Sequence, residues 1–428
     1  MTRVEPQWVQ HMREALEEFV QDVRQSLPEQ PSVADIERTL LEAQRQLMRD
    51  LMQSVVDDHA PPPLKTSRTQ WKSQGRRYRQ VNHLWGKVRV PLQCFKHREN
   101  GNHESVFLDS SLDRSGWTPA SLDFLGELVT QLPAETASEL AQKAGMSVSR
   151  AELDRLGRAL GQACNDEVRA LLVKQALAPL ERDKREKEGR VMVLQMDGCF
   201  VLGQAQDGKC SGIEIKTACM YPQNAPRERT LYSSVEAAEN FCDPVAGLLR
   251  QAGVRHNDTV VLVGDGAAWI ARIAELQNIP LVLDVFHASH YLDGVMQASD
   301  WTDIQRSSER KRLLKGEIRV QSWLETYLPP ASKRETWSEE AKSALAYLQA
   351  RLPTMDYPVF LFRGWPIGSG QIEGINKSVI GHRMKRSGQH WSRPGARGMA
   401  SLRARRYSRR SLLSFDHLRH VAFSTPHF

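Results

Sequence analysis

Apolar residues recur at helical spacing twice near the start of the chain. From Trp8 to Val20 every fourth residue is apolar, and after Pro31 a similar spacing returns and continues to Val55. This period is that of a helix with one apolar face, and the proline marks a break between two helices. The pattern predicts a helical N-terminal arm over residues 1–59. Dimerisation or DNA contact is the alternative to a purely structural arm.

Residues 60–116 change from this period to a strand-like pattern. Three prolines from Pro61 cannot lie inside a helix and mark a boundary. Between Arg76 and Arg98 apolar positions are interspersed with basic ones, and a turn is expected at Trp85-Gly86. We therefore predict a linker followed by a small β-rich module.

Within that module Cys94 and His97 have the spacing of metal ligands. No second pair follows, and His103 is the only nearby candidate. Because a structural zinc site needs four ligands, the residues favour a module without zinc.

Residues 117–185 return to a helical pattern that contains a possible helix-turn-helix. Ala141 is small and lies four residues before Gly145, which suits the turn of that motif. Either Ser147 or Ser149 is expected to cap the second helix. The pattern is equally typical of a DNA-recognition motif and of an ordinary helical corner.

After a charged linker at 183–190, strands and helices alternate. Strands are expected at 190–196, 200–204, 213–220, 259–263 and 281–285, and helices at 235–252, at 267–277 and after His287. The order β-β-β-α-β-α-β-α is that of the ribonuclease H-like fold, an α/β fold with a mixed sheet flanked by helices. We therefore predict a ribonuclease H-like catalytic core whose first part spans residues 186–287.

The remaining residues complete that core. Residues 288–365 are charged and rich in helix formers, and Pro329-Pro330 divides them into at least two parts. This composition predicts a helical insertion. Residues 366–428 are expected to hold one more core helix and a basic C-terminal tail.

Three carboxylates occupy sequence positions that a core of this kind is expected to bring together. Asp197 and Asp265 each follow a predicted strand and precede a glycine, whereas Glu373 lies at a predicted helix start, five residues after Gly368. Neighbouring parallel strands bring their end residues to one edge of a sheet, so we expect these side chains to converge. Together they can hold two Mg²⁺ ions, which activate a nucleophile and stabilise the leaving oxygen of a phosphodiester. The alternatives are tight Asp-Gly turns and a favourable helix-start position for Glu373.

Asp284 and His287 follow the last predicted strand. One interpretation is a hydrogen-bonded structural pair. In the others, the imidazole orients a carboxylate, contacts the scissile phosphate or caps the following helix. Glu214 and Asp207 also lie near predicted strands, and we expect them to be solvated or paired.

The net charge of +7 is concentrated in the C-terminal tail. From Asn376 to Phe428 there are twelve lysines or arginines and one acidic residue, Asp416. A run of one sign that begins beside the carboxylates favours contact with DNA phosphates, and a tryptophan among them can stack on a base. The predicted DNA contacts are Lys377, Arg383, Lys385, Arg386, Trp391, Arg393 and Arg397. Residues 403–410 are alternatively a disordered arm.

Composition narrows the setting of the protein. No apolar run approaches the ~20 residues of a membrane helix, and the first six residues do not resemble a signal peptide. Six cysteines without CxxC spacing fit reduced thiols better than a disulfide framework. These features predict a cytoplasmic, nucleoid-associated protein without a membrane partner.

These motifs resemble those of DDE transposases of bacterial insertion sequences, in particular the Mutator-like group with its Kra-type elements. The resemblance covers most of the chain and is weaker before residue 130. It is specific at Asp197-Gly198, at 264–269, at Asp284-x-x-His287, at 368–373 and through 379–391.

The resemblance implies roles for these residues. Asp197, Asp265 and Glu373 would form the metal triad, and Asp284 with His287 would form the aspartate-x-x-histidine signature of Mutator-like enzymes. The helical insertion before the glutamate is likewise a family feature. Relatives often carry a CxxC pair in the N-terminal region. His97 and Asn100 take those positions here, a departure that argues against a zinc-stabilised N-terminal module.

The function implied is that of a DNA transposase. Such an enzyme binds the terminal inverted repeats of its element and target DNA, both double-stranded. It cleaves with Mg²⁺ as cofactor, for which Mn²⁺ substitutes, and joins 3′-ends to the target. Pairing two ends favours a homo-oligomer, a dimer or higher. The alternatives are a catalytically silent, domesticated transposase that acts as a DNA-binding protein, and a structure-selective nuclease of the same fold.

Overall fold

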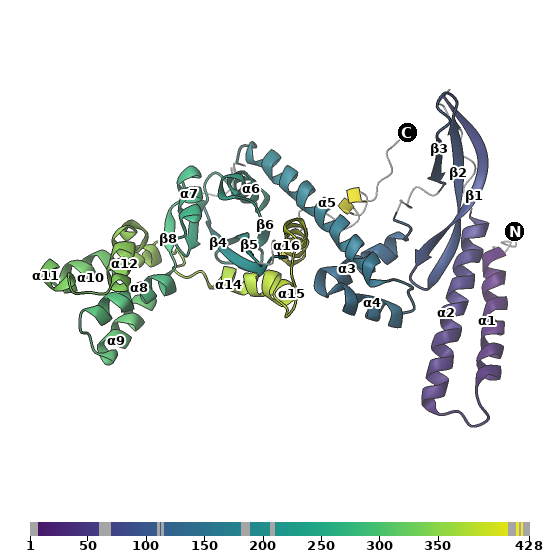
Figure 1. Cartoon of the computed structure of the whole chain (residues 1–428), viewed down its shortest axis with the longest axis horizontal. Helices are drawn as coiled ribbons and strands as arrows, with labels where there is room; N and C mark the ends of the chain where they lie inside the picture. Colours follow the sequence, from purple (N-terminus) through teal and green to yellow (C-terminus); the bar gives the residue numbers. More distant parts are fainter. Residues whose placement is uncertain are drawn as a thin grey trace. The chain divides into compact units, whose positions relative to one another are not determined.

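A computed structural model describes most of the chain, and this part forms two compact units (Figure 1). The described residues are 7–59, 70–108, 112, 115–180, 189–205, 210–409, 417, 418, 421 and 422. One unit is Met1–Leu160 with Phe415–Phe428, and the other is Gly161–Ser414. The division falls inside helix α5 (Arg150–Ala176), before the predicted linker. The prolines from Pro61, most of the charged linker, Asp207, Arg410 and Asp416 lie outside the described residues.

The first unit begins with the two predicted helices, α1 (Gln7–Ser26) and α2 (Val33–Asp58). A capping box starts α2, in which Ser32 and Asp35 satisfy each other's backbone N–H groups. Among the described side chains of these helices Val23 alone is buried, and Leu16 of the predicted apolar stripe is 52% exposed. Most of the apolar face therefore remains open to solvent.

The predicted β module is confirmed as a three-stranded antiparallel sheet of β1 (Trp71–His83), β2 (Gly86–His97) and β3 (His103–Phe107). The chain turns between β1 and β2 at the predicted place, before Gly86. Val81, Val88 and Phe107 form a small core on one face, and Met52 of α2 packs against it. The alternation of apolar and basic residues thus reflects one covered and one open face.

Helices α3 (Pro119–Gln131), α4 (Ala134–Lys143) and α5 follow, as predicted. Ala141 is fully buried and Gly145 turns the chain with φ +96°. Of the two predicted caps, it is Ser149 that begins α5: its hydroxyl accepts from the Glu152 N–H, and Glu152 accepts in return. The local geometry is that of a tight helical corner, which fits both interpretations given above.

The second unit is built on a five-stranded mixed sheet in the order β6-β5-β4-β7-β8. Parallel pairing joins β4 to β7 and β7 to β8, whereas β5 runs antiparallel to both its neighbours. The mixed α/β class predicted from the order of elements is confirmed. The strands are β4 (Val191–Leu202), β5 (Gly212–Pro222), β6 (Thr230–Ser234), β7 (Thr259–Gly264) and β8 (Leu281–Leu283).

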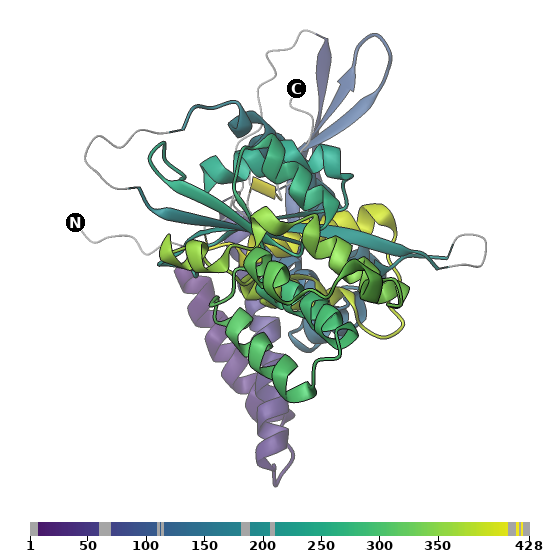
Figure 2. The same ribbon diagram turned by 90° about the vertical axis from the view of Figure 1, so that its left-hand side faces the viewer.

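Two of the predicted strands were wrong. Residues 190–196 and 200–204 belong to one continuous strand, β4, which pairs with β5 along its whole length. Glycine at 198 does not interrupt it, because β5 supplies hydrogen bonds on one side throughout. Figure 2 shows the resulting β4–β5 hairpin reaching beyond the other strands. The third strand of the series is β6, whose sequence Thr-Leu-Tyr-Ser-Ser lacks the apolar pattern of a buried strand although all five residues are buried.

Helices cover both faces of this sheet. Figure 1 shows α6 (Ala238–Gln251) and α14 (Gly370–Asn376) on opposite sides of it, and α16 (Arg393–Tyr407) contacts β5 and β6. The alternative of a disordered arm was wrong for the described part of 403–410. Arg403 is 3% exposed and donates to the carbonyl oxygens of Ser378 and Val379. The basic tail is therefore part of the core as far as α16.

The helical character predicted for residues 288–365 is confirmed, and these helices share their core with the sheet. Val193 and Val282 of the sheet belong to the same apolar cluster as Trp323 and Leu345 of the insertion. Pro330 precedes a short helix, as the predicted break requires. The elements are α8 (Val285–Ala298), α9 (Asp303–Leu314), α10 (Val320–Tyr327), α11 (Ala331–Arg334), α12 (Glu339–Gln349), a 3₁₀ turn (Leu352–Thr354) and α13 (Tyr357–Phe362).

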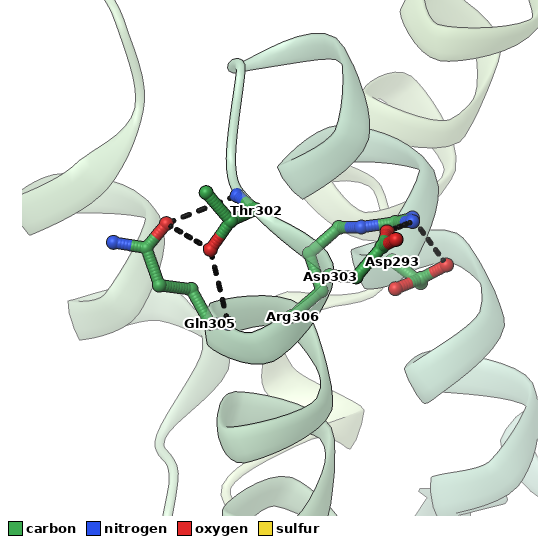
Figure 3. Close-up of polar contacts among 5 residues, drawn as sticks. All are labelled: Asp293, Thr302, Asp303, Gln305 and Arg306. Atoms are coloured by element: carbon green, nitrogen blue, oxygen red, sulfur yellow. Dashed lines mark hydrogen bonds and ion pairs between the residues drawn. The ribbon is translucent and has the colours of Figure 1, made fainter.

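Polar contacts fix the corner between α8 and α9 in this insertion (Figure 3). Thr302 and Gln305 form a capping box at the start of α9. Arg306 bridges the two helices, because its guanidinium contacts Asp293 of α8 at 3.0 Å and Asp303 at 2.6 Å. The insertion is thus held as a defined body beside the sheet.

Candidate active site

The five predicted catalytic residues line one cavity of about 180 Å³ in the second unit. They come from four places in the chain: the middle of β4, the turn after β7, the start of α8, and the first turn of α14. The lining includes Asp197, Asp265, Asp284, His287, Ser369 and Glu373. These residues therefore share one cavity beside the parallel part of the sheet.

Asp197 lies on β4 just past the point where its parallel neighbour stops. The β4–β7 pairing ends at Gln195 and Val263, so beyond it one side of β4 is open. Asn376 of α14 donates its side-chain N–H to Asp197 Oδ2 at 2.8 Å. Burial raises the pKa of Asp197, and the charge of Asp265 adds to the rise, while the hydrogen bond from Asn376 lowers the pKa in part.

Asp265 is held by the turn after β7. Gly266 has φ +79°, and a side chain there would also collide with the hydroxyl of Tyr347. Asp265 Oδ1 accepts from the Ala267 N–H at 2.9 Å, and its backbone carbonyl accepts from the Tyr347 hydroxyl at 2.7 Å. Arg351 donates to the carbonyl of Gly266. The glycine of the Asp-Gly pair is thus required by the turn, and α12 of the insertion braces it.

Helix α14 is fixed to the sheet by Gln195. The buried Gln195 amide donates to the Gly368 carbonyl at 3.0 Å and accepts from the Ile372 N–H at 2.9 Å. These bonds bracket the start of the helix and place Glu373 in its first turn, as predicted. A carboxylate is stabilised there by the helix dipole.

Asp284 caps α8 and ties it to the start of α14. Its Oδ1 accepts from the N–H groups of Phe286 and His287 at 2.8 and 3.0 Å. Its Oδ2 accepts from the Ser369 N–H at 2.5 Å and the Ser369 hydroxyl at 2.7 Å. In the Asp284–His287 pair, the His287 backbone N–H makes the hydrogen bond. The exposed imidazole is not part of it, and His287 lines the cavity. Asp284 therefore shapes the site, whereas the His287 ring faces it.

Glu373 pairs with Lys377 in this conformation. Its Oε1 lies 2.8 Å from Lys377 Nζ, and its side chain is 66% exposed. Among the described residues no three acidic, histidine or cysteine side chains lie close enough together to hold a metal ion. An exposed i,i+4 ion pair is worth only about 0.3–0.5 kcal/mol. A side-chain rotation that brings Glu373 to a divalent cation therefore costs little.

The predicted DNA contacts divide into exposed and buried residues. Lys377, Lys385, Arg386 and Arg393 are exposed, and Arg397 is half-buried. Arg383 corrects the prediction, because it is 5% exposed and stacks over the Trp391 ring at 5.4 Å. Trp391 itself is half-buried and donates its indole N–H to the Met384 carbonyl at 3.0 Å. One face of this ring is therefore covered by Arg383 and not free for a base.

Gln195, Asn376 and Tyr347 were not predicted. Gln195 had a signal, because it is the one polar residue in the otherwise apolar run 191–196. Asn376 lies three residues after Glu373, and residues at that spacing share one side of a helix. Tyr347 had no local signal, since its partner is a carbonyl far away in the sequence. Glu214 pairs with Lys216 at 2.6 Å, as predicted.

A larger hollow of about 1110 Å³ lies between α8 and α12. It is lined by single charged groups such as Asp293, Lys333 and Glu340 among small and polar side chains. In the smaller cavity burial, together with the charge of Asp265, raises the pKa of Asp197, so the smaller cavity is the candidate site.

Comparisons with known proteins add no name to this site. No protein-family model matches the chain, and no curated protein matches it. Among the helices that the structure describes, none is long and apolar enough to cross a membrane.

Proposed function

We propose that the chain is a DDE transposase of the Mutator-like group. It would bind the ends of its insertion sequence, cleave DNA strands with divalent cations and join the 3′-ends to target DNA as a homo-oligomer. The observation that carries this proposal is that Asp197, Asp265 and Glu373, far apart in the sequence, line one cavity together with Asp284 and His287.

The architecture supports a ribonuclease H-like core. Following the chain, the second unit runs β4, β5, β6, α6, β7, α7 (Ala268–Leu276), β8 and α8. The order of element types is the predicted β-β-β-α-β-α-β-α, with a mixed sheet between helices, although the first three strands differ from the predicted ones. One carboxylate lies within the first strand, where its end was expected, one follows the fourth strand and one lies on a later helix.

The donor set fits divalent magnesium. Carboxylate oxygens are the ligands that Mg²⁺ prefers, and Asp197, Asp265 and Glu373 supply them from three elements. Burial, and to a smaller extent the charge of Asp265, raises the pKa of Asp197, and a cation bound beside this carboxylate would offset both effects. When bound there, a pair of ions lowers the pKa of a water or 3′-hydroxyl and stabilises the leaving oxygen.

The chain's own residues would prepare that chemistry. Gln195 and Asp284 hold the start of α14 against the sheet, so the backbone of Glu373 is fixed while its side chain can rotate. The exposed imidazole of His287 faces the same cavity and can donate a hydrogen bond to a phosphate oxygen. Lys377 lies on the rim beside Glu373, where a DNA phosphate can take the place of that carboxylate.

A cleavage assay tests the proposal. The substrate is a supercoiled plasmid that carries the DNA flanking the gene on both sides. We expect strand cleavage with Mg²⁺ or Mn²⁺ and none with EDTA. Asp197→Ala, Asp265→Ala and Glu373→Gln should abolish cleavage, because each removes a predicted metal ligand, yet leave a gel shift of the same DNA largely intact.

Glu214→Gln is the matched control, because Glu214 is a carboxylate on the neighbouring strand that pairs with Lys216 outside the cavity lining. It should cut as well as the wild type. An Asp265→Ala variant with full activity would reject the triad. Binding without cleavage in either metal would favour a silent DNA-binding protein, and cleavage of branched DNA without element ends would favour a structure-selective nuclease.

A further inference from the structure

The buried side chain of Asn376 has one satisfied and one unsatisfied end. Asn376 is 5% exposed, and its Nδ2 donates to Asp197 Oδ2 at 2.8 Å. Its Oδ1 is buried and has no hydrogen-bond partner among the described residues. Buried side-chain oxygens without a donor are rare, because they lose water without gaining a replacement. A donor is therefore expected beside Asp197.

The position of this amide is well determined by its surroundings. Asn376 is the last residue of α14, one helical turn after Glu373, and Gln195 anchors the start of the same short helix to β4. The amide oxygen and nitrogen are joined to one carbon, so the unpartnered oxygen also lies near the Asp197 carboxylate. Exchanging the two atoms would set an oxygen against a carboxylate, which fixes their assignment.

We propose that Asn376 is a positioning residue of the candidate metal site. Its N–H holds one oxygen of Asp197, so that the carboxylate keeps one orientation toward the cation. Its free oxygen would accept a hydrogen bond from a water molecule beside that carboxylate. This inference rests on the proposed function, and it adds to the carboxylate triad a neutral residue that orients one ligand.

An amide suits position 376 because it is neutral and can still donate a hydrogen bond to the Asp197 carboxylate. The half-buried Asp197 carboxylate accepts from Asn376 Nδ2 at 2.8 Å. A carboxylate at 376 would add repulsion, and an apolar side chain would remove this hydrogen bond. Outer partners that orient a metal ligand typically contribute 10–100-fold to metal affinity.

The test is a titration of the full-length protein with Mn²⁺, in which electron paramagnetic resonance measures the free ion. Asn376→Leu keeps nearly the same shape and removes both the donor and the acceptor. Asn376→Ala removes them with less risk of a steric clash. We expect both variants to bind Mn²⁺ about 10–100-fold more weakly than the wild type. Ser378→Ala is the control, because its hydroxyl bonds only back to the Gly374 carbonyl among the described residues, and it should bind like the wild type.

The outcomes separate this inference from the proposed function. A wild type that binds no Mn²⁺ at this site would overturn both. A wild type that binds the ion, with Asn376→Leu folded and binding equally well, would overturn the role of Asn376 alone. If Asn376 only fastens α14 to the sheet, both variants should melt at lower temperature but keep the same gain in melting temperature on addition of Mn²⁺. If neither variant folds, Asn376→Ser decides in the same titration, with the same expected loss of affinity.

Discussion

Asp284 and Asp197 are carboxylates on the same cavity, and their surroundings differ. Asp284 is 2% exposed and accepts from the N–H groups of Phe286, His287 and Ser369 and from the Ser369 hydroxyl. Asp197 is half-buried next to a second carboxylate, and burial raises its pKa. Protein donors satisfy the Asp284 carboxylate, whereas the Asp197 carboxylate is left with excess negative charge.

This contrast distinguishes, within one small region, a structural carboxylate (Asp284) from one suited to chemistry (Asp197). A carboxylate surrounded by protein donors fixes the backbone and gains nothing from a cation. A carboxylate that is desolvated and repelled by a neighbour stores unfavourable energy that a cation can release. The two residues should therefore respond in opposite ways to loss of charge and to addition of metal.

The largest expected effect is at Asp284. Asp284→Ala removes a 2%-exposed carboxylate and leaves four part-buried donors without their acceptor, so we expect the free energy of unfolding to fall on the order of 3 kcal/mol. Urea unfolding followed by circular dichroism measures it. Ser369→Ala removes only the hydroxyl donor and should cost about 1 kcal/mol. An Asp284→Ala protein as stable as the wild type would contradict the structural role of Asp284 that distinguishes it from Asp197.

Asp197→Asn should act in the opposite direction in metal-free protein. The amide removes the buried charge and its repulsion from Asp265 while it can still accept from Asn376, so we expect a higher melting temperature. Addition of Mg²⁺ should raise the melting temperature of the wild type and leave that of the variant nearly unchanged. A variant that melts lower and still responds to Mg²⁺ would mean that Asp197 is a structural carboxylate like Asp284.

The pH dependence sharpens the same point. The pKa of Asp197 is raised in the folded state, whereas that of an unfolded aspartate is about 3.9. The folded state therefore keeps the proton to higher pH, and this residue's contribution to metal-free stability falls as pH rises from about 4 through the raised pKa. The stability difference between Asp197→Asn and the wild type should grow over that range. A difference that is constant with pH would contradict the raised pKa.

The smallest effect is expected at the rim. Lys377→Met breaks the exposed pair with Glu373, so the free energy of unfolding should change by less than about 0.5 kcal/mol. Mn²⁺ affinity should change by less than about threefold, because that is the ratio to which such an energy corresponds. A change of tenfold or more would show that Lys377 controls the orientation of Glu373 far more strongly than an exposed ion pair can.

Elements with a local pattern were predictable from the sequence. The helical arm, the β module, the insertion and the turn at Asp265 follow from periodicity, prolines and the Asp-Gly pair. Strand β6 was missed because its polar residues are buried against other elements. The Ser233 hydroxyl donates to the Thr217 hydroxyl of β5, and α16 packs against β6. The length of β4 was missed because its pairing with β5, not its own residues, carries it past Gly198.

The candidate site shows the same division. A strand end and a helix start place the backbones of Asp265 and Glu373, and such places can be predicted from a sequence, whereas Asp197 lies in the middle of β4 and not at the predicted strand end. The burial of Arg383 and the partnership of Asn376 with Asp197 depend on which helix packs on which strand. The rotamer of Glu373 depends on an exposed neighbour four residues away. None of these contacts leaves a periodic pattern in the sequence.

The most direct test of the central claim is a crystal structure with Mn²⁺, in which anomalous scattering locates the ions. We predict two peaks about 3.5–4 Å apart in the cavity, with carboxylate oxygens of Asp197 and Asp265 as ligands and Glu373 turned from Lys377 to join them. Crystals that bind Mn²⁺ elsewhere and leave this cavity without a peak would contradict the proposed metal site and the enzyme built on it.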